Sequence, residues 1–276
     1  MLNEKKGMLS KIISVAMWIS SINIFFILIY MLYSSLRTRA DIITNTLGLP
    51  YRLTIENYIR LFVNNRFEMY FFNSVFILLV SLFLIVVLSS MVAYALGRFR
   101  FKLNKPLRLF FLLGMMFPIQ LGIVPIFIIM RNLNLIDSYL SVILILGSGI
   151  SMPVFMLTNF FAKLPTEIYE AAKIDGAGEW TIFLRIMFPL AKPGILSVCI
   201  INSVGIWNQF FIPLIFLQSN ENQTIPLAIV RLTTNLFNTM DLALAASVIS
   251  TVPVFILFIL FSRKIIDGFT AGAVKG

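Results

Sequence analysis

The charged residues of this chain are spaced so that six long stretches contain none. These charge-free windows run from Ile12 to Leu36, Met69 to Gly97, Leu109 to Met130, Ser138 to Ala162, Pro193 to Asn220 and Leu242 to Ser262, and each is 21 to 29 residues long. About 20 apolar residues in a helix cross the roughly 30 Å hydrocarbon core of a membrane. Each window therefore predicts one membrane-spanning helix.

The composition supports a membrane protein. Of the 276 residues, 59% are hydrophobic and only 12% are charged, whereas soluble domains carry about a quarter charged residues. This balance excludes a water-soluble enzyme, a disordered chain and a collagen-like chain. A membrane β-barrel needs strands that alternate apolar and polar residues, but Val75 to Val87 is apolar on every face. We predict an all-α, polytopic membrane protein in a single domain of residues 1–276, with six transmembrane helices at about residues 12–36, 70–97, 109–130, 138–162, 193–217 and 242–262.

Lys and Arg residues are distributed unequally between the two sides that six spans define. The side holding both termini and the loops after the second and fourth windows carries 15 of them, and the other side carries 7. Positive charge collects on the cytoplasmic side of membrane proteins. Both termini, and the loop of residues 163–192, are therefore expected in the cytoplasm.

Several kinds of chemistry lack their usual residues. The chain has no His and one Cys, Cys199, so zinc sites, His-based catalysis and an internal disulfide are not expected. No window contains Asp or Glu, which argues against a proton-coupled or sodium-coupled carrier. A phosphate-binding loop of the form G-x-x-x-x-G-K-[ST] is also absent. We therefore expect no metal and no cofactor, and no ATP binding by this chain.

The loop of residues 163–192 predicts two short helices. Pro165 suits a first helical turn and Gly176 suits a terminator, so residues 165–175 should form one helix and residues 179–187 another. Residues at spacings of three and four share a helix face. Here Ile168, Ala171, Ala172 and Asp175 share one, which gives an apolar, small-residue strip beside acidic groups. A helix this short needs a supporting surface. That surface is either a partner protein or the chain's own bundle.

The same loop resembles a known motif. Glu170-Ala171-Ala172, with Gly176 six residues after the Glu and then Ile186 and Pro189, is similar to the EAA loop of ABC-importer permease subunits. The family ends this motif in Leu-Pro, where this chain has Phe188-Pro189. Residues 207–210 (Trp-Asn-Gln-Phe) and the tail of residues 267–276 resemble the maltose-type, carbohydrate-uptake branch, although the family more often has Glu in place of Gln209. The resemblance runs from about Leu53 to the C-terminus.

The resemblance implies a type I ABC importer permease fold and a role for two of the motifs. In the family, the EAA helix docks into a groove of a separate cytoplasmic ATPase, which assigns ATPase coupling to Glu170, Ala171, Ala172, Asp175, Gly176, Ala177 and Gly178. The alternative for Glu170 is a solvated charge paired with Lys173. The family's tail reaches the ATPase interface, which assigns that role to Gly268, Thr270, Ala271, Gly272 and Lys275. A flexible tail with no contacts is the alternative, because small residues at a terminus are commonly disordered.

A transport path needs polar groups inside the apolar bundle. Trp207 lies near the middle of its window, and Asn202, Asn208 and Gln209 are close to it in the sequence. An aromatic face together with amide groups is suited to bind a sugar. The alternative is that these residues only join helices.

Five prolines within the windows predict kinks: Pro118, Pro125, Pro153, Pro213 and Pro253.

Together these features predict the membrane-spanning permease subunit of an ATP-driven, binding-protein-dependent sugar importer in the bacterial cytoplasmic membrane, and not an enzyme. The implied partners are a homologous second permease subunit, two copies of a cytoplasmic ATPase subunit, an extracytoplasmic sugar-binding protein, the sugar and membrane lipid, with no nucleic acid. The alternatives are an ABC permease for another solute and, from other classes, an ion-coupled carrier or an intramembrane enzyme.

Overall fold

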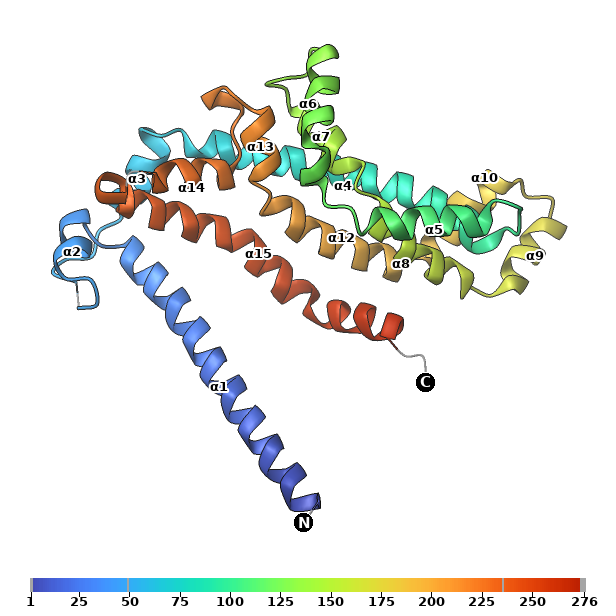
Figure 1. Ribbon diagram of the computed structural model, residues 1–276, viewed down its shortest axis with the longest axis horizontal. Helices are drawn as coiled ribbons and strands as arrows, with labels where there is room; N and C mark the ends of the chain where they lie inside the picture. Colours follow the sequence, from blue (N-terminus) through green and yellow to red (C-terminus); the bar gives the residue numbers. More distant parts are fainter. Residues whose placement is uncertain (1, 49, 235, 274–276) are drawn as a thin grey trace. The chain divides into compact units, whose positions relative to one another are not determined.

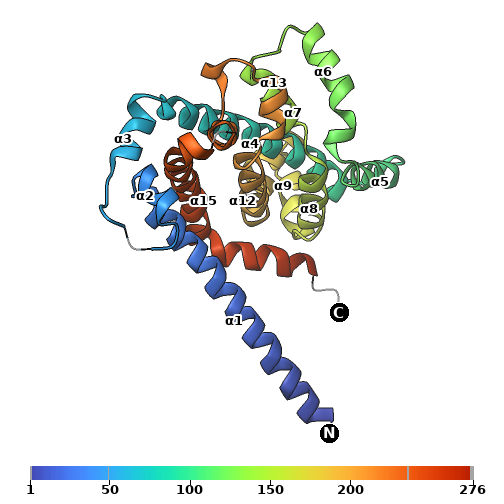
Figure 2. The same ribbon diagram turned by 60° about the vertical axis from the view of Figure 1, so that its left-hand side comes forward.

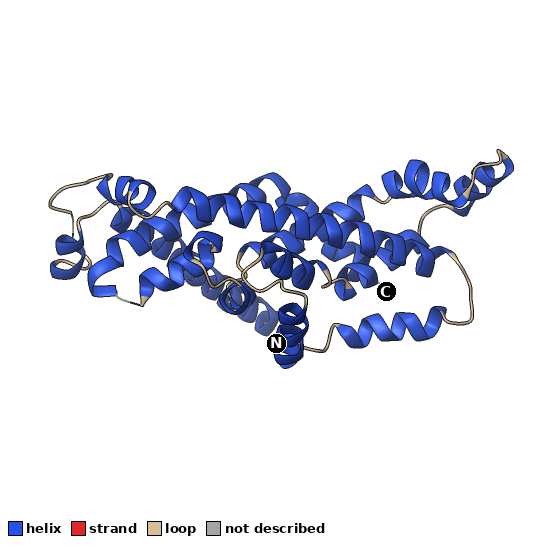
Figure 3. Cartoon of the chain, turned by 90° about the horizontal axis from the view of Figure 1, so that it is seen from above, coloured by secondary structure: helices blue, strands red, loops and turns tan. Residues whose placement is uncertain are grey.

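The computed structural model describes residues 2–48, 50–234 and 236–273, and this part of the chain contains helices, turns and loops but no strand (Figure 3). The all-α prediction is confirmed. The α-helices are α1 (Leu2–Ser35), α2 (Arg39–Thr44), α3 (Glu56–Val63), α4 (Phe67–Arg98), α5 (Asn104–Gly114), α6 (Ile123–Asn132), α7 (Tyr139–Gly147), α8 (Ser151–Ala162), α9 (Thr166–Ile174), α10 (Glu179–Ile182), α11 (Phe188–Leu190), α12 (Lys192–Trp207), α13 (Phe211–Phe216), α14 (Ile225–Thr233) and α15 (Leu236–Ala273). Two 3₁₀ turns, η1 (Ile119–Gly122) and η3 (Asn220–Asn222), and a π-helical turn, η2 (Phe183–Met187), complete the elements.

Three helices are long and apolar enough to cross a membrane by themselves: Ile13–Ser35 of α1, Phe67–Arg98, which is α4, and Asn238–Phe261 of α15. Three further candidates are pairs of helices joined at a bend, of 92° between Asn104–Gly114 and Ile119–Asn132, 43° between Tyr139–Gly147 and Ser151–Ala162, and 71° between Glu179–Leu190 and Lys192–Trp207. With each pair counted as one span, the described chain has up to six. The upper number equals that of the predicted windows, although the third pair begins at Glu179, within the loop of residues 163–192, and not at the start of the predicted window.

The bends differ from the unbroken helices that the sequence predicts. The windows at 109–130, 138–162 and 193–217 are each interrupted, and Figure 2 shows α6 turned away from α5. Pro125, Pro153 and Pro213 are the third residues of α6, α8 and α13. The first four N–H groups of a helix have no partner within it, so proline at this position forfeits no hydrogen bond. These three prolines therefore mark new helices after a break, not kinks inside one.

The described chain divides into two compact units. Unit 1 comprises residues 1–68 and 228–252, and unit 2 comprises residues 69–227 and 253–276. Pro253, which lies within α15, falls at this division. The description of residues 1–276 as one domain stays a prediction.

Unit 1 is organised around the buried side chain of Arg37. Its Nε donates to the Asp41 carboxylate at 2.8 Å, and its other nitrogens donate to main-chain carbonyls, including that of Asp41 at 3.1 Å. The Asn57 amide donates to the carbonyls of Ser35 and Arg37, both at 2.8 Å. A buried guanidinium must be paired and hydrogen-bonded to be tolerated. These bonds therefore fix the turn where α1 ends.

Unit 2 is built on α4, α8 and α12, which run alongside one another (Figure 1). Two glycines permit the close approach. A Cβ on Gly97 of α4 would lie 2.8 Å from the carbonyl oxygen of Thr158 in α8, and a Cβ on Gly194 of α12 would lie 2.8 Å from the ring of Phe160. A buried cluster at this end of the unit includes Tyr94 and Phe161 and continues into α10. The bundle therefore supports the loop of residues 163–192.

Asp137 joins two loops at the other end of unit 2. Its backbone is left-handed, with φ of 61°. Its carboxylate accepts hydrogen bonds from the N–H groups of Gln218 and Ser219 at 2.9 and 3.0 Å, and from the Ser219 hydroxyl and the Asn222 amide at 3.1 and 3.2 Å. Burial by itself would raise the pKa of Asp137, but these donors hold it below the ordinary value. The loop between α13 and α14 is thereby tied to the start of α7.

We expect Asp137→Ala to lower the free energy of unfolding by about 3 kcal/mol, because it removes several bonds to a charged acceptor and leaves a residue with a Cβ in left-handed backbone. Asp137→Asn, which keeps one acceptor oxygen and tolerates that backbone, should cost about 1 kcal/mol. Thermal unfolding of the detergent-solubilised protein measures both. Because the folded pKa is lowered, the contribution is present above pH 3.8 and is lost as the pH falls through the folded value. Equal losses in the two variants would contradict this role.

Candidate functional site

The helix α9 ends in a left-handed turn, a backbone conformation that glycine adopts without strain. Gly176 has φ of 78°. The N–H of Ala177 donates to the carbonyl of Ala172 at 3.0 Å, and the N–H of Gly176 donates to that of Lys173 at 3.1 Å. These two bonds form a Schellman motif, which satisfies carbonyls at the helix end. The structure thus has the short helix and the glycine terminator that the sequence predicts.

The second predicted helix, residues 179–187, is regular only as far as Ile182. It continues as the π-helical turn η2, in which the N–H of Phe188 donates to the carbonyl of Phe183. Pro189 has no N–H for the carbonyl of Arg185, and its ring would clash with that carbonyl in a regular α-helix. Widening the turn by one residue avoids the clash. Pro189, which the sequence predicts to follow this helix, therefore changes the last turn of the helix from α to π geometry.

One side of α9 is fastened to α4 and α10 by polar contacts. The guanidinium of Arg98 lies 4.5 Å from the centre of the Tyr169 ring and donates to the carbonyl of Thr166 at 3.2 Å. The Glu179 carboxylate accepts hydrogen bonds from the Tyr169 hydroxyl and from the Lys173 ammonium, both at 2.7 Å. These contacts link the last turn of α4, the whole of α9 and the start of α10.

The electrostatics of Glu179 favour its charged form. Burial by itself would raise the pKa of Glu179, but the hydrogen bonds from Lys173 and Tyr169 hold it below the ordinary value. The hydrogen bond to Glu179 in turn raises the pKa of Lys173. Burial, followed by the hydrogen bond to Glu179, raises the pKa of the Tyr169 hydroxyl. At neutral pH the carboxylate is therefore an acceptor for Lys173 and Tyr169, which remain protonated, and it also accepts a longer bond of 3.4 Å from the Tyr94 hydroxyl of α4.

Ala172 is the apolar part of the same fastened side. It is 6% exposed and packs into the buried cluster that contains Phe161, Ile182 and Phe183. A larger side chain would push α9 away from this cluster, because protein interiors are close-packed. The small size of Ala172 is thus explained by packing within this chain.

The opposite side of α9 is exposed and is made by Glu167, Glu170, Ala171 and Ile174, which we call the exposed face of α9. Ile174 is 86% exposed. Lys173 pairs with Glu179 and not with Glu170, so the ion pair considered as an alternative for Glu170 is not formed. The predicted strip is also divided, because Ala172 points into the protein while Ala171 and Asp175 are exposed. The residues that match the EAA motif therefore lie on two opposite sides of one helix.

The other residues assigned to coupling lie in or next to this turn. Gly176 and Gly178 are exposed, and Ala177 is half-buried against the cluster. The tail residues Gly268, Thr270, Ala271 and Gly272 lie within the backbone of α15, which continues to Ala273. Lys275 lies outside the described residues.

The four residues assigned to a substrate path have different surroundings and partners in the structure. Trp207 is 3% exposed and its ring meets that of Phe71 edge to face, 5.9 Å between centres. The amides of Asn202 and Asn208 donate to main-chain carbonyls of their own helix, both at 2.9 Å, and Gln209 accepts from the N–H of Phe211 at 3.0 Å. In a continuous helix the seven-residue spacing of Asn202 and Gln209 would put both on one face, but α12 ends at Trp207, so the two do not share a helix face. Their role in substrate binding stays a prediction.

Sequence reasoning missed the polar contacts that hold α9. Arg98 counted only as a charge that sets topology, and Tyr169 and Glu179 had no assigned role. Arg98 and Tyr169 are 71 positions apart in the chain, so no helical spacing links them. Among the described residues, no group of three or more Cys, Asp or Glu is placed to hold a metal ion.

Comparison with known proteins gives one consistent answer. Residues 85–272 match the family described as binding-protein-dependent transport system inner membrane component. The arabinooligosaccharides transport system permease protein AraQ of Halalkalibacterium halodurans is 37% identical, over 91% of each chain. The diacetylchitobiose uptake system permease protein NgcG of Streptomyces coelicolor is 32% identical, over 90% of this chain and 83% of the relative.

A solved structure shares the fold. It is that of a bacterial ABC transporter involved in the import of the acidic polysaccharide alginate, and it has 20% identity and a TM-score of 0.80 over 93% of this chain and 96% of the other. The extent of the family match and the identity to permeases along nearly the whole length decide the assignment. This chain belongs to the family of inner-membrane permease components of binding-protein-dependent ABC transport systems, and it is a multi-pass transport subunit, not an enzyme.

Proposed function

We propose that this chain is the permease subunit of a sugar importer and forms half of the translocation pathway together with a homologous second permease subunit. The names of its relatives support a carbohydrate substrate, since they include permeases for arabinooligosaccharides, diacetylchitobiose and starch degradation products. The charge-free windows support a neutral, hydroxylated substrate, because a charged one would need a counter-ion. An extracytoplasmic binding protein delivers the sugar, and access alternates between the two sides of the membrane.

The exposed face of α9 docks on a cytoplasmic ATPase subunit, and one copy of this subunit serves each permease. The observation that carries this step is the division of α9 into a fastened side and an exposed side. Arg98 and Glu179 bind the fastened side to the spanning helix α4 and to α10, so a displacement of α9 is transmitted to the bundle. The Glu170 carboxylate, which has no hydrogen bond or ion pair within the described residues, is free to contact a basic residue of the ATPase. Asp175 and Gly178, which are exposed at the turn, border the same surface.

The orientation of the chain follows from its basic residues. Both termini and the loop of residues 163–192 lie in the cytoplasm of a bacterium, as the 15 to 7 distribution of Lys and Arg supports. This places α9 on the side where ATP is available. The end of α15, including Gly268 and Gly272, lies on the same side and reaches the ATPase interface.

The substrate path contains Asn208, which is exposed, and the half-buried Asn202 and Gln209. Trp207 supports the path by packing on Phe71. Reconstitution of the complex in vesicles with its binding protein tests the proposed substrate class. Uptake of oligosaccharides that depends on ATP supports it, whereas uptake of a non-sugar solute by the same complex, with no response to sugars, supports the alternative of another ABC permease.

Ile174 tests the docking surface. We expect Ile174→Asn to reduce co-purification of the ATPase about tenfold, because a large side chain that is 86% exposed here should be covered in the complex. Leu103→Asn is the matched control, since Leu103 is 61% exposed and precedes α5, where Asn is a favourable cap. The control should leave co-purification unchanged. If the two variants behave alike, α9 does not dock.

A further inference from the structure

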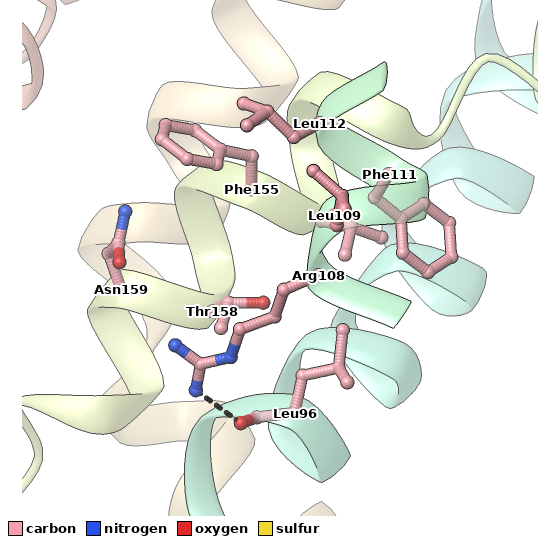
Figure 4. Close-up of a pocket in the computed structure, with 9 residues that line it drawn as sticks. Leu96, Arg108, Leu109, Phe111, Leu112, Phe155, Thr158 and Asn159 are labelled. Atoms are coloured by element: carbon pink, nitrogen blue, oxygen red, sulfur yellow. Dashed lines mark hydrogen bonds between the residues drawn. The ribbon is translucent and has the colours of Figure 1, made fainter. Parts of the chain in front are cut away.

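A groove lies between α4, α5 and α8 in unit 2. It has a volume of about 280 Å³, and its walls are mostly apolar, with Leu109 and Leu112 from α5 and Phe155 from α8 (Figure 4). These three side chains are between 42% and 54% exposed within the chain. Pockets that enclose a whole small molecule are about 300 to 1,000 Å³. This groove therefore suits part of a long apolar molecule, such as one acyl chain.

Polar groups stand at one end of the groove. The guanidinium of Arg108 donates one hydrogen bond, to the carbonyl of Leu96 at 2.6 Å (Figure 4). A guanidinium has five N–H donors, so most of its donors remain for a ligand. The Thr158 side chain is directed toward Arg108, and its hydroxyl is buried with no hydrogen-bond partner in the described residues (Figure 4). A buried hydroxyl without a partner is costly, and because Thr158 lines the groove, a ligand in the groove is placed to supply one.

The position and charge of this end identify the ligand class. Arg108 immediately precedes the charge-free window that begins at Leu109, so it lies at the level where a span meets the headgroups. Residues 97–108 contain five Lys and Arg residues and no carboxylate. Basic pockets between spanning helices on the cytoplasmic side suit anionic lipid headgroups. A spanning helix of a partner protein would instead bring an apolar surface against the guanidinium.

We propose that this groove binds one anionic phospholipid, with its phosphate at Arg108, a polar atom of its ester region at the Thr158 hydroxyl, and an acyl chain between α5 and α8. Leu112 is one helical turn beyond Arg108, about 6 Å along α5, so the chain would run from the headgroup level into the membrane. The inference uses the cytoplasmic orientation proposed above but not the sugar or the ATPase contact. Loss of lipid binding and loss of sugar transport are therefore separate outcomes.

Native mass spectrometry of the intact transporter tests the proposal, with phosphatidylglycerol and phosphatidylcholine of identical acyl chains as probes. We expect one phosphatidylglycerol retained for each copy of this chain, and about tenfold weaker retention of phosphatidylcholine. Arg108→Gln should weaken phosphatidylglycerol retention about tenfold, the loss expected when a charge-assisted hydrogen bond is removed. Arg100→Gln is the matched control, because Arg100 is an exposed cation of the same loop that does not line the groove.

A second variant keeps the test independent of the Leu96 contact. Leu112→Trp fills the groove and leaves Arg108 in place, so it should also abolish retention of the lipid, while the subunit composition of the assembled complex stays unchanged. Equal losses in Arg108→Gln and Arg100→Gln would overturn the proposal, since they indicate a diffuse attraction to the basic loop. Complete competition by glycerol phosphate would also overturn it, because the headgroup alone would then account for binding. So would a disulfide between Leu112→Cys and a cysteine placed in the second permease, which would show that a protein occupies the groove.

Discussion

Glu170→Lys is expected to abolish the stimulation of ATP hydrolysis by the sugar-loaded binding protein, while membrane insertion and basal hydrolysis remain. The carboxylate lies on the exposed face of α9 and has no partner within the described residues, so the reversal does not disturb the fold of this chain. Against a basic residue of the ATPase it replaces attraction with repulsion, and a like charge at an interface costs several kcal/mol. Hydrolysis by the reconstituted complex, with and without loaded binding protein, measures the effect.

Glu170→Gln provides the graded comparison for this reversal. It removes the charge but adds no repulsion, so an intermediate stimulation is expected. Salt supplies a further check, because attraction between partly exposed charges is screened. Stimulation of the wild-type complex should fall as the ionic strength rises, whereas that of Glu170→Gln should change less. Normal stimulation in Glu170→Lys would show that the carboxylate remains in solvent during transport.

The sequence predicts well those features for which a wrong residue at one position would cost much free energy. A charged residue in the membrane interior costs about 3 kcal/mol or more, so the spacing of Lys, Arg, Asp and Glu defines the spans. Likewise, φ of 78° at Gly176 is available to few other residues, so the end of α9 is evident from one position. The breaks after Gly114 and Gly147 are less evident, because a helix can bend, continue or restart near Pro or Gly.

The features that the sequence predicts poorly depend on contacts between distant residues. The rotation of α9 about its axis is set by Arg98 and Glu179, and this rotation places Ala172 inside and Ala171 outside. The helical spacing of these residues is compatible with either arrangement. Trp207 is a similar case, because an aromatic ring in a span can bind a ligand or pack in the protein. Its contact with Phe71 depends on the packing of α12 against α4.

Glu179→Ala is expected to reduce sugar transport at least tenfold, although the ATPase still binds. This substitution removes the acceptor shared by Tyr169 and Lys173, so α9 keeps its exposed face but loses its fastening to α10. The Lys173 pair is exposed to solvent on both partners and contributes little, whereas the Tyr169 bond, to a charged acceptor, contributes about 2 kcal/mol. Transport should therefore fall more than co-purification of the ATPase, which distinguishes positioning from docking.

A double-mutant cycle with Tyr169→Phe and Glu179→Gln isolates this link. The Tyr169 hydroxyl and the Glu179 carboxylate are the two partners of one hydrogen bond. The double variant should therefore lose no more transport than the more affected single variant. The pH dependence has a definite sign. The lowered pKa of Glu179 keeps the contact present above pH 4.5, and the raised pKa of Lys173 preserves it up to pH 10.5. Transport should therefore not change between pH 6 and 8 through these groups, and additive losses in the cycle would show that α9 is fastened by other contacts.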